Sequence, residues 1–139
     1  MNWAGSLTRI AGYEVETLQK RLAEVAGRRL DAELRRTLLD AEAEAEADNA
    51  RSDPEAAIYY PQFIKGWRVR RDRLDTLIKA IAVEEEGARD ALSRAFEDQK
   101  KYEQVVAMAD AARSAGAIDA AERVADLVLR VAHVVPARA

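Results

Sequence analysis

Cysteine is absent from the 139-residue chain, and histidine occurs once, at His133. The chain therefore has no disulfide, no thiolate nucleophile and no cysteine-based metal site. A single histidine cannot supply the paired Glu-x-x-His motifs of a di-iron helical bundle. The sequence also contains no glycine-rich phosphate loop and no Ser-His-Asp arrangement. These absences argue against an enzyme, and we expect neither a cofactor nor a metal.

Strong positive charge and long hydrophobic runs are also missing. The formal net charge is -3 at pH 7, so no broad basic field attracts a nucleic acid, although residues 65–73 form a local basic cluster. Residues 1–10 lack the apolar core of a secretory signal. The most apolar stretch, residues 124–135, contains Asp126 and Arg130 and is too short to span a bilayer. We therefore expect a cytoplasmic protein that does not bind nucleic acid or insert into a membrane.

Only six glycines and three prolines interrupt a chain that is 49% apolar and 34% charged. This composition is too apolar for disorder and is typical of long helices with narrow apolar seams. No proline occurs between Trp3 and Ala50. Within this segment a coiled-coil seam steps by three, four and three residues. Its members are Val15, Leu18, Leu22 and Val25.

The apolar stripe then continues in steps of four residues through Leu30, Leu34 and Leu38. Such a shift predicts a stutter, where the supercoil unwinds locally and the stripe keeps facing its partner. The chain next breaks near Asp53, which with Pro54 and Glu55 has the pattern of a helix N-terminus. Pro61 predicts a kink after a short first helical segment.

From residue 60 onward the pattern is clearest, with steps of four and three sustained over about seven heptads. The fifteen seam positions are Tyr60, Ile64, Trp67, Arg71, Leu74, Ile78, Ile81, Glu85, Ala88, Leu92, Ala95, Gln99, Tyr102, Val106 and Ala109. All except Arg71, Glu85 and Gln99 are apolar. A weak break follows at residues 114–116. Residues 117–135 form another helical segment, whose wide apolar face favours contacts on more than one side.

These patterns predict an all-α fold, a long antiparallel two-helix coiled-coil hairpin with a C-terminal helical extension. The hairpin takes residues 1–116, with helices over about 3–50 and 57–114 and a tip at about 51–56. Residues 117–139 form an apolar C-terminal helix and tail. Folding about residue 53 sets residues whose numbers sum to roughly 106 opposite each other. The acidic run 40–48 then lies beside the basic cluster 65–73, and Glu85 lies near Lys20 and Arg21.

Three stretches resemble a known family: LTRI at 7–10 with LQKRLAE at 18–24, SDPEAA at 52–57 with Tyr59 and Tyr60, and ALSRAFEDQKKYE at 91–103. They are similar to the FliJ family of flagellar type III export proteins, particularly its alphaproteobacterial members, over about residues 7–113. The family usually ends in a helix rich in arginine and glutamate. Residues 117–135 depart from that pattern, so no family contact is carried over to them.

The resemblance implies an accessory, central-stalk-like protein at the cytoplasmic face of the flagellar basal body. It would bind the export ATPase ring and the export gate, and it would also handle export chaperones. Apolar positions near the open end of the hairpin are the candidate protein-binding residues: Trp3, Leu7, Ile10, Tyr13, Phe96, Tyr102 and Val106. The alternative is a generic coiled-coil adaptor or chaperone unrelated to flagella, which docks through its C-terminal apolar helix.

Overall fold

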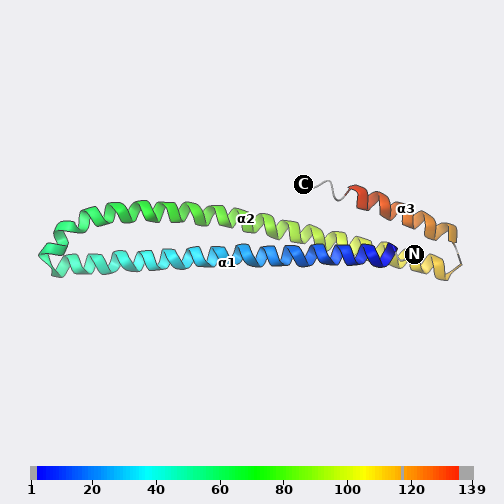
Figure 1. Cartoon of the computed structure of the whole chain (residues 1–139), viewed down its shortest axis with the longest axis horizontal. Coiled ribbons are helices and arrows are strands. Elements are labelled where there is room, and N and C mark those ends of the chain that lie inside the picture. The colour runs from blue at the N-terminus through cyan, green and yellow to red at the C-terminus, as the bar shows by residue number, and fades with distance from the viewer. Residues whose placement is uncertain (1–2, 117, 135–139) are drawn as a thin grey trace. The chain divides into compact units, whose positions relative to one another are not determined.

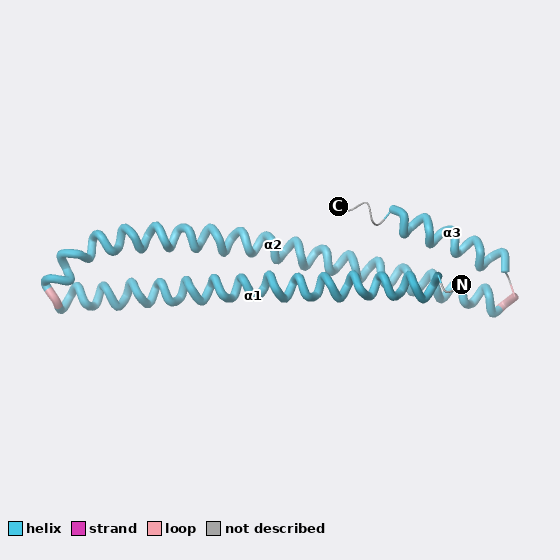
Figure 2. The backbone as a smooth tube through the Cα atoms, in the orientation of Figure 1, coloured by secondary structure: helices cyan, strands magenta, loops and turns pink. Residues whose placement is uncertain are grey.

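The computed structural model describes residues 3–116 and 118–134, and these residues form three helices (Figures 1 and 2). The helices are α1 (Trp3–Ser52), α2 (Pro54–Ser114) and α3 (Ile118–Val134). The long helices α1 and α2 contact each other as an antiparallel hairpin, and the shorter α3 follows. The structure confirms the predicted all-α hairpin with a C-terminal helix.

The turn between the two long helices is a single residue, Asp53. Its carboxylate accepts a hydrogen bond of 3.0 Å from the backbone N–H of Glu55, as an N-cap side chain does. Pro54 occupies the first helical position, where a missing N–H costs nothing. Helix α2 continues through Pro61, and its first turns are bent relative to the remainder (Figure 1). Proline removes one helical hydrogen bond and clashes with the preceding turn, which explains the bend.

Helix α2 ends at Ser114, where the sequence predicts a weak break. Gly116 has a φ of 78°, the left-handed conformation that glycine adopts without a steric penalty. Its N–H donates to the carbonyl of Arg113, and the N–H of Ala115 donates to the carbonyl of Ala111, each at 3.0 Å. These bonds satisfy carbonyls that the helix end would otherwise leave free.

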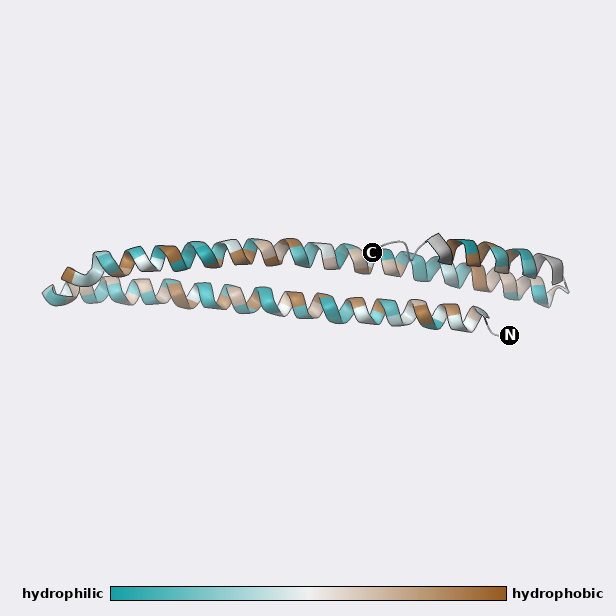
Figure 3. Ribbon diagram, turned by 45° about the horizontal axis from the view of Figure 1, so that its top comes forward, coloured by the Kyte–Doolittle hydropathy of each residue, from teal (hydrophilic) through white to brown (hydrophobic). Residues whose placement is uncertain are grey.

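Contacts divide the chain into two units, one of residues 20–90 and one of residues 1–19 with 91–139. In the first unit the core consists of Val25, Ala32, Ile78 and Ile81, with Leu74 packed against it. Every predicted seam position of α2 within this unit is buried or half-buried. Figure 3 shows apolar residues recurring along the long helices between polar segments.

The predicted stutter in α1 is wrong. The seam keeps a seven-residue repeat, with Val25, Ala32 and Leu39 buried and Arg29 and Arg36 half-buried between them. The side chains expected to continue the seam are instead exposed: Leu30 at 59%, Leu34 at 57% and Leu38 at 62%. Four residues turn an α-helix by more than one full turn, so a run of four-residue steps drifts around its surface. The three leucines therefore lie on the side of α1 away from α2, and Arg29, Ala32 and Arg36 occupy the seam instead.

The predicted register is also shifted in the middle of the hairpin. Glu85 contacts Arg29, with Nε to Oε1 at 2.7 Å, whereas it was predicted near Lys20 and Arg21. Arg21 contacts the neighbouring Glu84 instead. Closer to the turn the prediction is better, because the indole N–H of Trp67 donates to the carbonyl of Leu39 at 2.7 Å.

In the unit of residues 1–19 and 91–139, buried side chains come from all three helices. Helix α1 contributes Ala11 and Val15, α2 contributes Ala95, Tyr102 and Ala109, and α3 contributes Val128. Among the described residues, no helix is long and apolar enough to cross a membrane.

Candidate protein-binding surface

The first turns of α1 present apolar side chains on the side away from the seam. Ala11 and Val15 are buried, whereas Ile10 is 64% exposed and Tyr13 is 61% exposed. Residues three apart lie on the same side of a helix, so Ile10 and Tyr13 are neighbours on the surface. An exposed aliphatic residue beside an exposed tyrosine suits contact with another protein.

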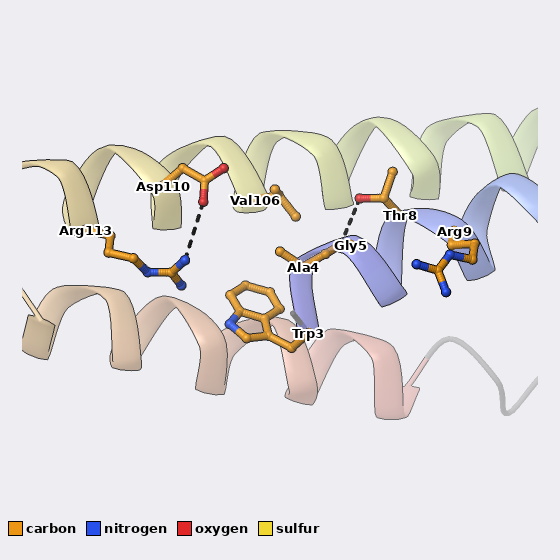
Figure 4. A pocket seen from close by; sticks show the side chains of 8 residues that line it. All are labelled: Trp3, Ala4, Gly5, Thr8, Arg9, Val106, Asp110 and Arg113. Carbon is orange, nitrogen blue, oxygen red and sulfur yellow. Dashed lines mark hydrogen bonds and ion pairs between the residues drawn. The ribbon is translucent and has the colours of Figure 1, made fainter. Parts of the chain in front are cut away.

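Trp3 and Leu7, the other α1 residues predicted for this surface, are half-buried. Trp3 lines a groove of about 470 Å³ whose other residues come from the start of α1 and the end of α2 (Figure 4). The lining residues are Trp3, Ala4, Gly5, Thr8, Arg9, Val106, Asp110 and Arg113. Small side chains at Ala4 and Gly5 leave the hollow open. The structure thus places Trp3 and Val106 in one groove.

On α2 the three predicted residues differ in exposure. Phe96 is exposed and Val106 is half-buried, but Tyr102 is only 7% exposed. Tyr102 lies in the seam seven residues from both Ala95 and Ala109, which are also buried. Its ring therefore packs within the unit, and we leave it out of the binding surface. Met108 is exposed and was not predicted; a large apolar residue outside the seam repeat was the available signal.

A buried ion pair lies in the other unit, in the seam between α1 and α2. Arg29 donates to Glu85 at 2.7 Å and also to Glu33, four residues along α1. The hydrogen bond from Arg29 lowers the pKa of Glu85, although burial opposes that shift. The same bond raises the pKa of Arg29. The second carboxylate oxygen of Glu85, Oε2, is buried without a hydrogen-bond partner. A charge pair in this position favours one register of the hairpin more than it adds stability.

A second group of ion pairs lies nearer the turn and involves the basic cluster at residues 65–73. Arg71 contacts Asp40 at 2.8 Å and Asp75 at 2.6 Å. Arg70 contacts Glu42 at 3.3 Å. The predicted pairing of the acidic run with the basic cluster is confirmed for these two arginines. Exposed pairs of this kind contribute only about 0–1 kcal/mol each to stability. Their main effect is to favour one register between α1 and α2.

The exposed apolar side chains in the unit of residues 1–19 and 91–139 suit contact with another protein. Ile10, Tyr13, Phe96 and Met108 carry no group that acts as a nucleophile or base at neutral pH. Within the part of the chain that the structure describes, no three histidine or acidic side chains gather as a metal site.

Comparison with known proteins gives the family. No family model matches the chain, and no solved structure matches it significantly. The "Flagellar FliJ protein" of Caulobacter vibrioides strain NA1000 / CB15N is 54% identical over 122 residues, which covers 86% of this chain and 88% of that protein. The protein of the same name from strain ATCC 19089 / CIP 103742 / CB 15 gives the same values. The chain therefore belongs to the FliJ family of flagellar proteins.

Proposed function

We propose that the chain is an accessory, central-stalk-like component of the flagellar type III export apparatus, which binds the export ATPase ring and the export gate. The main support for this function is membership of the FliJ family, since the chain is 54% identical to the Caulobacter FliJ protein over 86% of its length. FliJ proteins are non-enzymatic components of flagellar export, so the chain acts by contact. Its proposed place of action is the cytoplasmic face of the basal body, and export chaperones are further proposed partners.

The exposed side chains Ile10, Tyr13 and Phe96 form the proposed contact surface, with half-buried Trp3, Leu7 and Val106 beside them. Large aromatic side chains bury much area at little entropic cost and often dominate protein interfaces. The surface keeps six of the seven residues predicted from the sequence, and Met108 joins it.

The direct test is ATP hydrolysis by the purified export ATPase of the same organism, with and without the chain. Ring assembly is followed in the same samples by size-exclusion chromatography. We expect faster hydrolysis together with a larger hexamer fraction. Unchanged hydrolysis, with no co-elution of the two proteins, contradicts the stalk function while leaving the family membership in place.

Single substitutions then test the contact surface. We expect Ile10→Asp, Tyr13→Asp and Phe96→Asp each to weaken ATPase binding by roughly tenfold or more, because each places a charge in an apolar contact. Val83→Asp is the matched control, since Val83 is exposed on α2 in the other unit. Circular dichroism checks that all four variants keep their helices. Undiminished binding by the three variants refutes this surface.

A docking role for the C-terminal helix is the second candidate. The family membership excludes an adaptor unrelated to flagella, but Leu127 and Leu129 are exposed on α3. Truncation of residues 117–139 separates the two sites. If the surface at Ile10 and Phe96 is sufficient, the truncated chain still binds the ATPase; if α3 docks the partner, binding is lost.

A further inference from the structure

The basic cluster at residues 65–73 is only partly used by ion pairs within the chain. Arg70 and Arg71 contact acidic side chains of α1. Within the described residues, the other cations of this part of α2 have no ion pair, although all of them are exposed: Lys65, Arg68, Arg73 and Lys79. Each therefore carries a charge that an anionic partner can neutralise.

The four unpaired cations surround the side of α2 that faces away from α1. Val69 marks the middle of this side, because it follows seam position 67 by two residues, which turn a helix by about 200°. Lys65 and Arg73 lie four residues before and after Val69 and flank it on the surface. Arg68 and Lys79 are eleven residues apart, so they share one edge of the same side. We call this side of residues 65–83 the basic face.

Acidic side chains are scarce on the basic face. Asp72 is exposed, and it is the only acid on this side of α2 between Glu55 and the acidic run 84–86. Asp75 is half-buried and is held by two arginines. Four cations and one acid leave a formal charge of +3 on the face, although the whole chain carries -3.

Apolar side chains occur on the basic face only at wide intervals. Val69 is 49% exposed and Val83 is 71% exposed, and Ala80 is exposed between them. The turns that separate Val69 from Ala80 carry Arg73 and Thr76. A partner helix packs on an apolar stripe with a residue in nearly every turn, which this face does not offer. A fluid lipid surface accepts isolated apolar side chains among basic ones.

We propose that the basic face binds the anionic headgroups of a lipid bilayer surface, with this part of α2 lying along the surface. Electrostatic attraction by the four cations supplies most of the binding, and Val69 and Val83 add contact with the acyl boundary. This lipid binding is separate from the proposed contacts with the export apparatus and does not rest on them.

The acidic residues of α1 are compatible with this orientation. Exposed Glu44 and Asp48 follow buried Leu39 by five and nine residues, so they lie on the side of α1 away from α2. Two helix diameters, roughly 20 Å, then separate them from the bilayer. That distance is about two Debye lengths at physiological salt, so their repulsion by the lipid is largely screened.

Co-sedimentation of the full chain with lipid vesicles tests the binding. We expect the chain to pellet with phosphatidylcholine vesicles that contain roughly 30% phosphatidylglycerol, and not with pure phosphatidylcholine. About 0.5 M salt should release it, because salt screens the attraction. A sample without vesicles controls for sedimentation of the chain alone. No binding to the anionic vesicles, or equal binding to both kinds, overturns the inference.

Charge reversal tests the face itself. Each cation near an anionic surface strengthens binding about fivefold, so Lys65→Glu/Arg73→Glu should weaken it by about 25-fold or more. Lys100→Glu/Lys101→Glu is the matched control, since it changes two exposed lysines of α2 in the other unit and gives the same net charge. Circular dichroism checks the helices of both variants. Equal weakening by the two variants means that net charge alone matters and overturns the inference.

Short duplex DNA of mixed sequence is the alternative anionic ligand. We expect much weaker binding to DNA than to the anionic vesicles at the same salt, because Val69 and Val83 gain nothing from a phosphate backbone. Binding to DNA that is as tight as binding to the vesicles, and is lost in Lys65→Glu/Arg73→Glu, overturns the assignment to lipid.

A polarity-sensitive fluorophore on a single introduced cysteine tests the orientation, because the chain has no cysteine of its own. On anionic vesicles we expect a blue shift of the emission from Val69→Cys. The emission from Ala41→Cys should not change, since exposed Ala41 lies on the far side of α1, three residues after Leu38. A shift at Ala41 instead of Val69 assigns the contact to the exposed leucines of α1 and overturns the inference, as does no shift at either site.

Discussion

Two adjacent leucines in α1 provide the sharpest test of the seam. Leu39 is 9% exposed, whereas Leu38 is 62% exposed. Substitution by alanine removes the same three carbon groups at either site, and each buried group contributes about 0.8 kcal/mol. Leu39→Ala should therefore lower the free energy of unfolding by about 2.4 kcal/mol, with a further small loss if the seam does not close around the cavity. For Leu38→Ala we expect about 1 kcal/mol or less, because only a little over a third of that side chain is covered.

Urea unfolding followed by circular dichroism measures both changes. In thermal unfolding, the same difference corresponds to a fall in Tm of roughly 8 °C for Leu39→Ala and about 3 °C or less for Leu38→Ala. Equal losses at the two sites, or a larger loss at Leu38, refute the seven-residue seam. The four-residue leucine row would then be the true contact with α2.

Two further predictions follow from the pKa of Glu85 and from the glycines. Because the pKa of Glu85 is lowered from 4.5, its carboxylate stabilises the fold above that pH and loses this contribution as pH falls below it. Glu85→Gln should lower Tm at neutral pH, and the gap to the parent should shrink near pH 3. Gly66→Ala and Gly87→Ala have open space for a methyl group within a helix, so each should raise the free energy of unfolding by about 0.5–1 kcal/mol. Gly116→Ala should lower it by about 1 kcal/mol, because the φ of 78° disfavours alanine, and urea unfolding measures all three changes.

The sequence alone predicted the helices and most of the seam, because heptad spacing follows directly from helix geometry. Every predicted seam position in α2, from Tyr60 to Ala109, is buried or half-buried. The seam in the central part of α1 was mispredicted, because the leucines at 30, 34 and 38 are large and apolar but their four-residue spacing departs from the heptad. Arg29 and Arg36 occupy positions of the seven-residue repeat, but charged residues are usually found at the surface, so the sequence did not predict them in the seam. The exact register could not be predicted from the apolar pattern, because a heptad pattern fits its partner equally well after a shift of seven residues.

The exposure of the candidate residues follows from their position relative to the seam. Ile10, Tyr13 and Phe96 are exposed, and they lie outside the seam repeat. Tyr102 belongs to the repeat, and its burial follows from the same spacing that predicted α2. Met108 was missed because a single apolar residue outside the seam carries little pattern of its own. Membership of the seam therefore separates buried Tyr102 from exposed Ile10, Tyr13 and Phe96 among the candidate residues.

The charged seam and the exposed leucines are two consequences of one arrangement. A hairpin built only for its own stability would place leucine at the seam positions that Arg29 and Glu85 occupy. Replacing a buried ion pair by apolar residues of similar size is often neutral or stabilising. We therefore expect the double variant Arg29→Leu/Glu85→Leu to unfold at an equal or higher temperature than the parent. The leucines at 30, 34 and 38 contribute little to the hairpin, because each is more than half exposed.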